Sequence, residues 1–256
     1  MKALNIKFKI LFISIIVGIY PLYAKMNNIH ILEKRRKNLV NKKKVLEDLI
    51  KRKVILISDH DKPFKLSSGV TSHHYYNSKN CILDPQGLDL ISELLLKEVR
   101  KFNVKSVGGL ETGSIPLVSA ICLKSSLTES NPLSAFFVRK EPKKHGPQSD
   151  GPWAYFEGNP ISPIVIVDDV ITTGNSVIDK TLDRIKKLGS MEVIGIVCII
   201  DREQGAERLF KKHNLEFYSL FKHSNFKEYI DKKIMEKKKI YEHKQTKKLE
   251  PQSIPL

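Results

Sequence analysis

Apolar and polar positions divide the chain into short unbroken apolar runs and longer stretches in which apolar residues recur every three or four positions. The runs are rich in β-branched and aromatic residues and lie at 104–110, 133–138, 164–167, 192–200 and 215–220. Such runs predict strands that are buried on both faces of a parallel sheet. Helical spacing is found at 39–50, 83–102, 117–123 and 177–188. Strands that alternate with helices predict an α/β fold, a central parallel sheet flanked by helices.

The stretch before this sheet predicts a small N-terminal hood. Residues 64–77 contain two short strand-like pieces joined at Ser68 and Gly69. In the hood interpretation, Tyr75 and Tyr76 together offer a flat stacking surface and hydroxyls to a bound ring. The alternative is a hairpin whose tyrosines pack on a core.

The most informative chemistry follows the strand that starts at Ile164. Asp168 and Asp169 stand at its expected end, and a Thr-Thr-Gly-Asn-Ser loop at 172–176 leads into a predicted helix that ends at Gly189. A strand, a short polar loop and a helix point backbone N–H groups at an anion, assisted by hydroxyls and by a glycine that allows close approach. This pattern predicts a phosphate site.

A phosphate site alone does not account for two adjacent carboxylates. They fit a ligand that also carries hydroxyls, or a divalent metal that takes hard oxygen ligands, and a phosphorylated sugar with Mg²⁺ has both. The alternative is that Asp168 and Asp169 only cap the following helix. The attached loop at 172–176 favours the ligand.

Three further loops carry candidate chemistry. A Gly-rich turn at 111–116 can present amides to a second anion, or be only a tight turn. Residues 139–145 hold four cations and a histidine, in a run that is interrupted by Pro142 and closed by Gly146. The chain continues into a long irregular stretch, which favours a mobile basic lid over a solvated loop. Arg202 follows a strand at the ligand edge of the sheet, where it can bind a carboxylate through two hydrogen bonds. The alternative for Arg202 is a surface ion pair with Asp201 or Glu203.

Composition and charge add two points. The net charge of +16 comes largely from lysine runs near both ends, which we interpret as solvated faces rather than a specific nucleic-acid site. Three scattered cysteines form neither a disulfide framework nor a zinc site and indicate a reducing compartment.

The first 33 residues are interpreted as an extension. Three lysines precede an apolar run at 10–23, the outline of a secretory signal, but the run is short for a membrane span and Met26 offers a second start. We expect a start-site artefact or an extension, with a targeting peptide or a membrane anchor as alternatives. The expected division is 1–33, a main domain with its hood at 34–225, and a Lys-rich helix or tail at 226–256.

The residues at 167–174, Val-Asp-Asp-Val-Ile-Thr-Thr-Gly, resemble the phosphoribosyl-diphosphate (PRPP) signature of the type I phosphoribosyltransferases. The run Arg-Lys-Glu-x-Lys-x-His-Gly at 139–146 and the hood narrow the resemblance to the orotate phosphoribosyltransferases, over about 39–221. The resemblance implies a pentosyltransferase that moves ribose 5-phosphate from PRPP to orotate. The products are orotidine 5′-monophosphate and diphosphate, in UMP biosynthesis.

The resemblance also implies Mg²⁺ carried by PRPP near the two aspartates, a homodimer whose lid closes over the neighbouring subunit's site, and a cytoplasmic location. It implies catalytic roles for Lys143, His145, Asp168 and Asp169. The residues implied to bind PRPP are Arg139, Lys140, Lys143, His145, Asp168, Asp169, Val170, Ile171, Thr172, Thr173, Gly174, Asn175 and Ser176. Those implied to bind orotate are Tyr75, Tyr76, Thr172 and Arg202.

The chain departs from the family in two places, with Ser67 where many relatives have lysine and two tyrosines where many have phenylalanines. One alternative function is transfer to another base, a purine or uracil. Another is a non-catalytic PRPP-sensing regulator that binds nucleic acid through its basic ends. The sequence leaves open whether an orotidylate decarboxylase accompanies the enzyme.

Overall fold

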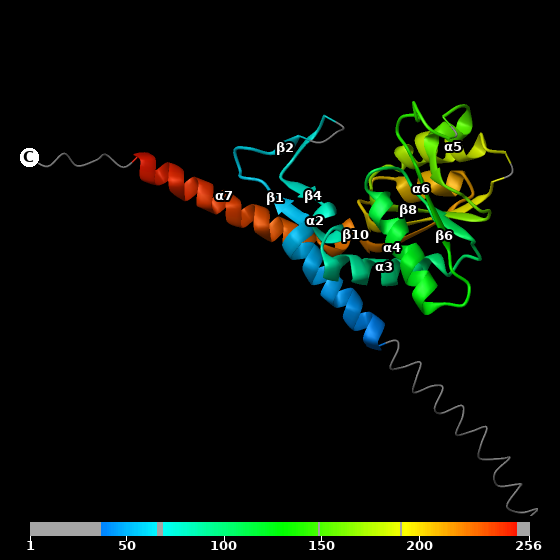
Figure 1. Ribbon diagram of the computed structural model, residues 1–256. Helices are drawn as coiled ribbons and strands as arrows, with labels where there is room; N and C mark the ends of the chain where they lie inside the picture. Colours follow the sequence, from blue (N-terminus) through cyan, green and yellow to red (C-terminus); the bar gives the residue numbers. More distant parts are fainter. Residues whose placement is uncertain (1–36, 66–68, 148, 190, 250–256) are drawn as a thin grey trace, which may run out of the picture. The chain divides into compact units, whose positions relative to one another are not determined.

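The structure is a computed structural model, which describes residues 37–65, 69–147, 149–189 and 191–249 (Figure 1). The extension predicted at 1–33 and the Ser67 position lie outside these residues. The chain divides into two compact units, Met1–Val45 and Leu46–Leu256. The described part of the first unit, residues 37–45, is helical. Among the described residues, no helix has the length and apolar character needed to cross a membrane.

A six-stranded sheet forms the centre of the second unit, in the order β10-β9-β8-β5-β6-β7 (Figure 1). Its strands are β5 (Ser106–Gly108), β6 (Ser134–Val138), β7 (Phe156–Gly158), β8 (Ile164–Ile171), β9 (Val193–Asp201) and β10 (Glu216–Lys222). The five predicted strands are confirmed and are parallel. β7 was not predicted: it pairs antiparallel with β6 at the edge of the sheet, where the fully buried Phe156 packs against Phe136.

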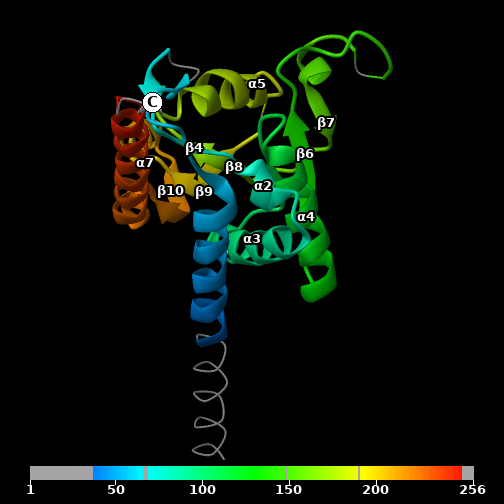
Figure 2. The ribbon, with the colours of Figure 1, turned by 90° about the vertical axis from the view of Figure 1, so that its left-hand side faces the viewer.

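Helices cover both faces of this sheet, which confirms the predicted α/β class. They are α3 (Pro85–Val99), α4 (Ser114–Thr128), α5 (Asp183–Lys186) and α6 (Ala206–Lys212). In β8, Ile164 and Ile166 join a buried cluster with side chains of α5 and α6. Val165 and Val167 point to the opposite face because side chains alternate along a strand, and α4 packs against β8. Figure 2 shows α5 and α3 on opposite sides of the strands.

Two helix starts illustrate how local sequence sets these elements. Asp84 caps α3: its Oδ1 accepts a hydrogen bond from Gly87 N at 2.9 Å, and Pro85 is the first helical residue, as predicted. The helix after the loop at 172–176 begins as a π-helix, η3 (Val177–Leu182), and continues as α5. Val177 and Ile185 are buried in one cluster, so the predicted apolar face is confirmed although the first turns are wider.

The hood consists of two small sheets. One pairs β1 (Ile55–Ile57) with β4 (His74–Tyr76), and the other pairs β2 (Phe64–Lys65) with β3 (Thr71–Ser72), all antiparallel. The remaining elements are η1 (Ile50–Val54), α2 (Lys79–Ile82), η2 (Pro152–Tyr155), η4 (His223–Asn225) and α7 (Lys227–Leu249). α7 packs on β1, and the Tyr229 hydroxyl donates a hydrogen bond to Lys51 O at 3.0 Å.

The strand order places a ligand crevice between β5 and β8. From this pair the chain order runs outward in opposite directions, to β6 on one side and to β9 and β10 on the other. In open parallel sheets, ligands bind at the carboxyl ends of the strands where the order reverses. The loops after β5 and β8 both start at this point.

Candidate active site

The two aspartates lie in the second half of β8, which continues to Ile171 rather than ending at the carboxylates as predicted. The backbone N–H of Asp169 donates a hydrogen bond to Asp168 Oδ1 at 2.9 Å, and the Ser78 hydroxyl donates to Asp169 Oδ2. The loop after β5 approaches closely: a Cβ added to Gly113 would lie 2.8 Å from Asp169 Oδ1. The Gly-rich turn and the aspartate pair therefore form one site.

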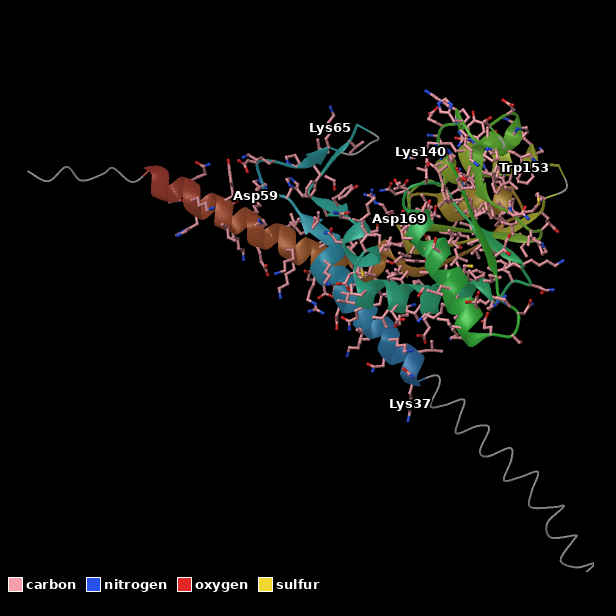
Figure 3. The ribbon with its side chains drawn as sticks, in the orientation of Figure 1. Lys37, Asp59, Lys65, Lys140, Trp153 and Asp169 are labelled. Atoms are coloured by element: carbon pink, nitrogen blue, oxygen red, sulfur yellow. The ribbon has the colours of Figure 1, made fainter. Side chains whose placement is uncertain are left out.

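Burial raises the pKa of Asp168 well above its ordinary value, and the neighbouring Asp169 charge raises it further. The positive charge of Lys140 lowers this pKa in part, and the Lys140 backbone is hydrogen-bonded to Glu111, in the turn whose Gly113 lies against Asp169. Figure 3 shows Lys140 and Asp169 at the same end of the sheet.

The aspartate pair offers hard oxygen ligands of the kind that Mg²⁺ takes. Within the described part of the chain, no group of three or more His, Cys, Asp or Glu side chains could hold a metal ion. The two carboxylates by themselves could supply only part of the ligand set of such an ion.

The loop at 172–176 has the features of an anion site. Gly174 has a φ of 84°, and a Cβ there would lie 2.6 Å from the Phe210 ring, so glycine is required for two reasons. Its carbonyl accepts from Val177 N at 3.1 Å, which starts the helix. Among the described residues, the amides of Thr173 and Gly174 donate to no protein acceptor. These amides at the start of a helix are available to a phosphate.

The basic lid is a hairpin arm. Arg139 N donates to Tyr155 O and Lys143 N to Ala154 O, both at 2.8 Å. Glu157 on β7 forms ion pairs with both cations, at 3.2 Å from Arg139 Nη1 and at 3.0 Å from Lys143 Nζ. The return arm of the lid therefore neutralises two of its cations.

The tip of the lid is separate from the aspartates. A concavity of about 420 Å³ is lined by Arg139, Lys143, Lys144 and His145 together with Glu157. His145 is exposed, and in the described residues no hydrogen bond or ion pair joins His145 or Lys143 to Asp168 or Asp169. The base of the lid at Lys140 is therefore tied to the turn beside the aspartates of its own chain. The tip of the lid, with Lys143 and His145, makes no such contact among the residues that the structure describes.

Arg202 lies at the end of β9 without a carboxylate partner. Its backbone N donates to Ile171 O at 2.8 Å, and its guanidinium carbon lies 5.9 Å from the centroid of the Tyr76 ring. Asp201 instead accepts from Glu203 N at 2.8 Å, and Glu203 accepts from the backbone and hydroxyl of Ser224. Across the described residues no ion pair involves Arg202, so the surface-pair alternative is wrong.

The two tyrosines point in different directions, which corrects the expectation that both rings form one surface. They are adjacent in β4, and neighbouring side chains of a strand point to opposite faces. Tyr75 is 43% exposed and lies beside the Phe64 ring. Tyr76 is 6% exposed, and its hydroxyl is hydrogen-bonded to His223 Nδ1 at 2.8 Å.

Sequence reasoning missed Ser78, Glu157 and His223. Each is a single polar residue outside the recognised motifs, and each reaches the site through a tertiary contact. Only the Glu157 position had a signal, because an acid directly before Gly158, in the segment that follows the basic run, could pair with a lid cation.

His74 should make the stability of the protein depend on pH. Its ring stacks on His223 with centroids 5.2 Å apart, and its Nε2 is buried without a hydrogen-bond partner in the described residues. Burial, followed by the charges of His223 and Arg202, lowers its pKa from 6.5 to about 4. Between these values the unfolded chain binds a proton that the folded chain does not. The free energy of unfolding should therefore fall as the pH is lowered, by up to about 1.4 kcal/mol per pH unit.

Urea unfolding at pH 7, 6 and 5 measures this slope. His74→Phe should flatten it, whereas His213→Asn, at an exposed position, should leave it unchanged. Equal slopes in wild type and His74→Phe would contradict the assignment to His74.

Comparison with known proteins agrees with this geometry. A sequence model of the phosphoribosyl transferase domain family matches residues 79–219, which include both loops of the crevice and the lid. The fold and site thus define the class, a phosphoribosyltransferase.

Curated relatives narrow the class. The orotate phosphoribosyltransferase of Aquifex aeolicus (strain VF5) is 38% identical over 186 residues, which cover 72% of this chain and 97% of the relative. That of Rhodopseudomonas palustris (strain TIE-1) is 43% identical over 162 residues, covering 63% and 85%. The chain belongs to the orotate phosphoribosyltransferase branch of the phosphoribosyltransferase family.

Solved structures agree. The Mycobacterium tuberculosis orotate phosphoribosyltransferase in complex with Fe(III) dicitrate matches with a TM-score of 0.58 at 26% identity, covering 71% of this chain and 96% of that one. The enzyme from Aeropyrum pernix matches with a TM-score of 0.55 at 25% identity, covering 73% and 99%.

Proposed function

We propose that this protein transfers ribose 5-phosphate from PRPP to N1 of orotate, forming orotidine 5′-monophosphate and releasing diphosphate in UMP biosynthesis. The observation that carries the choice of base is Arg202. A partly buried guanidinium without a carboxylate partner, beside an aromatic ring at the ligand edge of the sheet, suits a planar base that bears a carboxylate.

Each loop of the crevice has a role in this reaction. The 5′-phosphate binds to the amides and hydroxyls of residues 172–176, and the ribose hydroxyls donate to Asp168 and Asp169. Diphosphate lies against the Gly-rich turn that starts at Glu111. Thr172 is the first residue of the phosphate loop and follows Ile171, whose carbonyl accepts a hydrogen bond from Arg202 N, so it can contact both substrates.

The lid supplies cations for the leaving group. As the bond between the anomeric carbon and the diphosphate oxygen loosens, negative charge grows on diphosphate. The cations of the lid, Arg139, Lys140, Lys143 and His145, stabilise this charge more strongly in the transition state than in the ground state. Closure of the lid also excludes water that would hydrolyse PRPP.

Mg²⁺ fits this site as an ion brought by PRPP, with Asp168 and Asp169 as the residues that would hold it directly or through water. When bound, it would neutralise diphosphate charge.

We extend the proposal to a homodimer in which each lid closes over the partner's site. The separation of Lys143 and His145 from the aspartates of their own chain supports this arrangement. We place the enzyme in the cytoplasm, where its substrate PRPP is expected.

The test mixes the purified protein with orotate, PRPP and Mg²⁺ and follows orotate absorbance, with adenine, hypoxanthine and uracil as competing bases. We expect the enzyme to convert orotate and none of the three competing bases. PRPP binding without orotate turnover would reject the choice of base, and turnover of a purine or of uracil would favour the salvage alternative.

Arg202→Lys should raise KM for orotate about tenfold or more, because lysine cannot make the paired hydrogen bonds and each bond to a charged group contributes about 1.5–3 kcal/mol. KM for PRPP should change less than twofold. Arg208→Lys, at an exposed position on α6, is the matched control and should change neither. Equal changes in both KM values would remove Arg202 from orotate recognition.

A further inference from the structure

Arg184, which no motif includes, joins the phosphate-loop helix to the base of the lid. It lies in α5, and its guanidinium donates hydrogen bonds to two consecutive backbone carbonyls of the lid, to Arg139 O through Nη1 and to Lys140 O through Nη2 at 2.8 Å. A planar guanidinium with several fixed donors can hold two neighbouring carbonyls at once, which an ammonium cannot do in the same geometry.

The same guanidinium also contacts the return arm of the lid. Its central carbon lies 4.1 Å from the centroid of the Tyr155 ring, within the range of a cation–π contact. Tyr155 O in turn accepts from Arg139 N at 2.8 Å. Arg184 therefore fixes both arms of the lid hairpin where they leave the sheet.

A second tether holds the same peptide from the opposite side. Glu111, at the start of the Gly-rich turn after β5, accepts a hydrogen bond from Lys140 N at 2.6 Å through its Oε1. The backbone of Lys140 is thus held between the turn after β5 and the helix after β8. The charge of Lys140 acts on Asp168, so the position of this backbone limits where the Lys140 ammonium can lie relative to the aspartates.

We propose that Arg184 is a positioning residue, which sets the geometry of the lid by clamping the Arg139–Lys140 backbone to the helix that follows the phosphate loop. Only the expected effect of the clamp on catalysis depends on the proposed function. Its structural consequence, a lid base held in one conformation, can be measured without any substrate.

The first experiment is limited trypsin digestion of the full-length protein without substrates, with cleavage after the lid cations at 139–144 identified by mass spectrometry. Arg184→Lys keeps the charge but loses the two-carbonyl clamp and the planar stack, and should speed cleavage of the lid about tenfold. The matched control is Arg100→Lys. Arg100 makes a similar clamp far from the lid, to Asn131 O at 2.5 Å and to the Glu129 carboxylate, and its replacement should leave lid cleavage unchanged.

The second experiment is kinetic. Arg184→Lys should lower kcat about tenfold, of the order expected for losing a hydrogen bond from a charged donor, while KM for orotate stays within twofold. Arg100→Lys should change neither value. A residue that only stabilises the fold would instead lower Tm without separating kcat from KM.

Lid cleavage at the wild-type rate in Arg184→Lys, or equal acceleration in Arg100→Lys, would overturn the proposal. If Arg184→Lys does not fold, Tyr155→Leu removes the ring beneath the guanidinium and should speed cleavage in the same direction. If the wild-type protein does not turn over orotate, the proposed function is rejected. The digestion would still test the clamp, because it is done without substrates.

Discussion

Replacing Lys143 with alanine should lower kcat about 100-fold while KM for orotate changes less than threefold. The Lys143 side chain is 15% exposed and lines the concavity of the lid, where, in the proposed dimer, it can meet the diphosphate that leaves the partner's site. A preorganised charge that acts on a transition state commonly contributes a factor of 10²–10³. Steady-state kinetics with both substrates varied measures the effect, and an interaction made only in the transition state appears in kcat.

The ion pair of Lys143 with Glu157 supplies the control for this prediction. Lys143→Ala also breaks that pair, so a purely structural loss could imitate a catalytic one. Glu157→Gln breaks the same pair and keeps the ammonium, and it should therefore lower kcat far less than Lys143→Ala does. Comparable losses in the two variants would assign the effect to lid structure and remove Lys143 from the transition state.

Local sequence determined much of this fold. β8 and β9 are apolar on both faces, and only a strand covered by helices on both sides buries such a run. Asp84 and Pro85 start α3 because the cap and the fixed φ act within one turn. The turn at Gly174 and the helix after it were predicted for the same reason, since the residues that form them are consecutive in the chain.

Features that depend on long-range pairing were not predictable. β7 has only three residues and becomes a strand because the lid returns it to the edge of β6. Ser78 and Arg184 acquire their roles from partners 91 and 45 residues away, respectively. The tyrosine pair shows a different limit. Residues 64–77 were predicted to be strand-like, and alternation along a strand already forbids a shared surface for two adjacent side chains, as the pairing of β4 with β1 shows.

Asp168→Asn should raise stability at neutral pH while it abolishes most activity. Burial and the Asp169 charge raise the pKa of Asp168, so the folded protein binds a proton at a pH where the unfolded chain has lost it. The free energy of unfolding therefore falls as pH rises from the ordinary value of 3.8 through the raised pKa, and it stays lower above that range. Asparagine is neutral throughout. The variant should consequently gain stability above this interval and show no gain below about pH 3.8.

The cost in activity has the same origin as the gain in stability. An amide oxygen accepts more weakly than a carboxylate from ribose hydroxyls, and a hydrogen bond to a charged group contributes about 1.5–3 kcal/mol, so kcat/KM for PRPP should fall about 10- to 100-fold. Asp179→Asn removes the same charge from an exposed position on η3 and should change neither Tm nor kcat/KM. Thermal unfolding at several pH values, with kinetics at neutral pH, measures both effects. Lower stability of Asp168→Asn at neutral pH would contradict this prediction, because it would mean that the folded protein stabilises the Asp168 carboxylate. The aspartate pair would then contribute to the stability of the fold, and its assignment as a binding site for a cation and a sugar would lose this support.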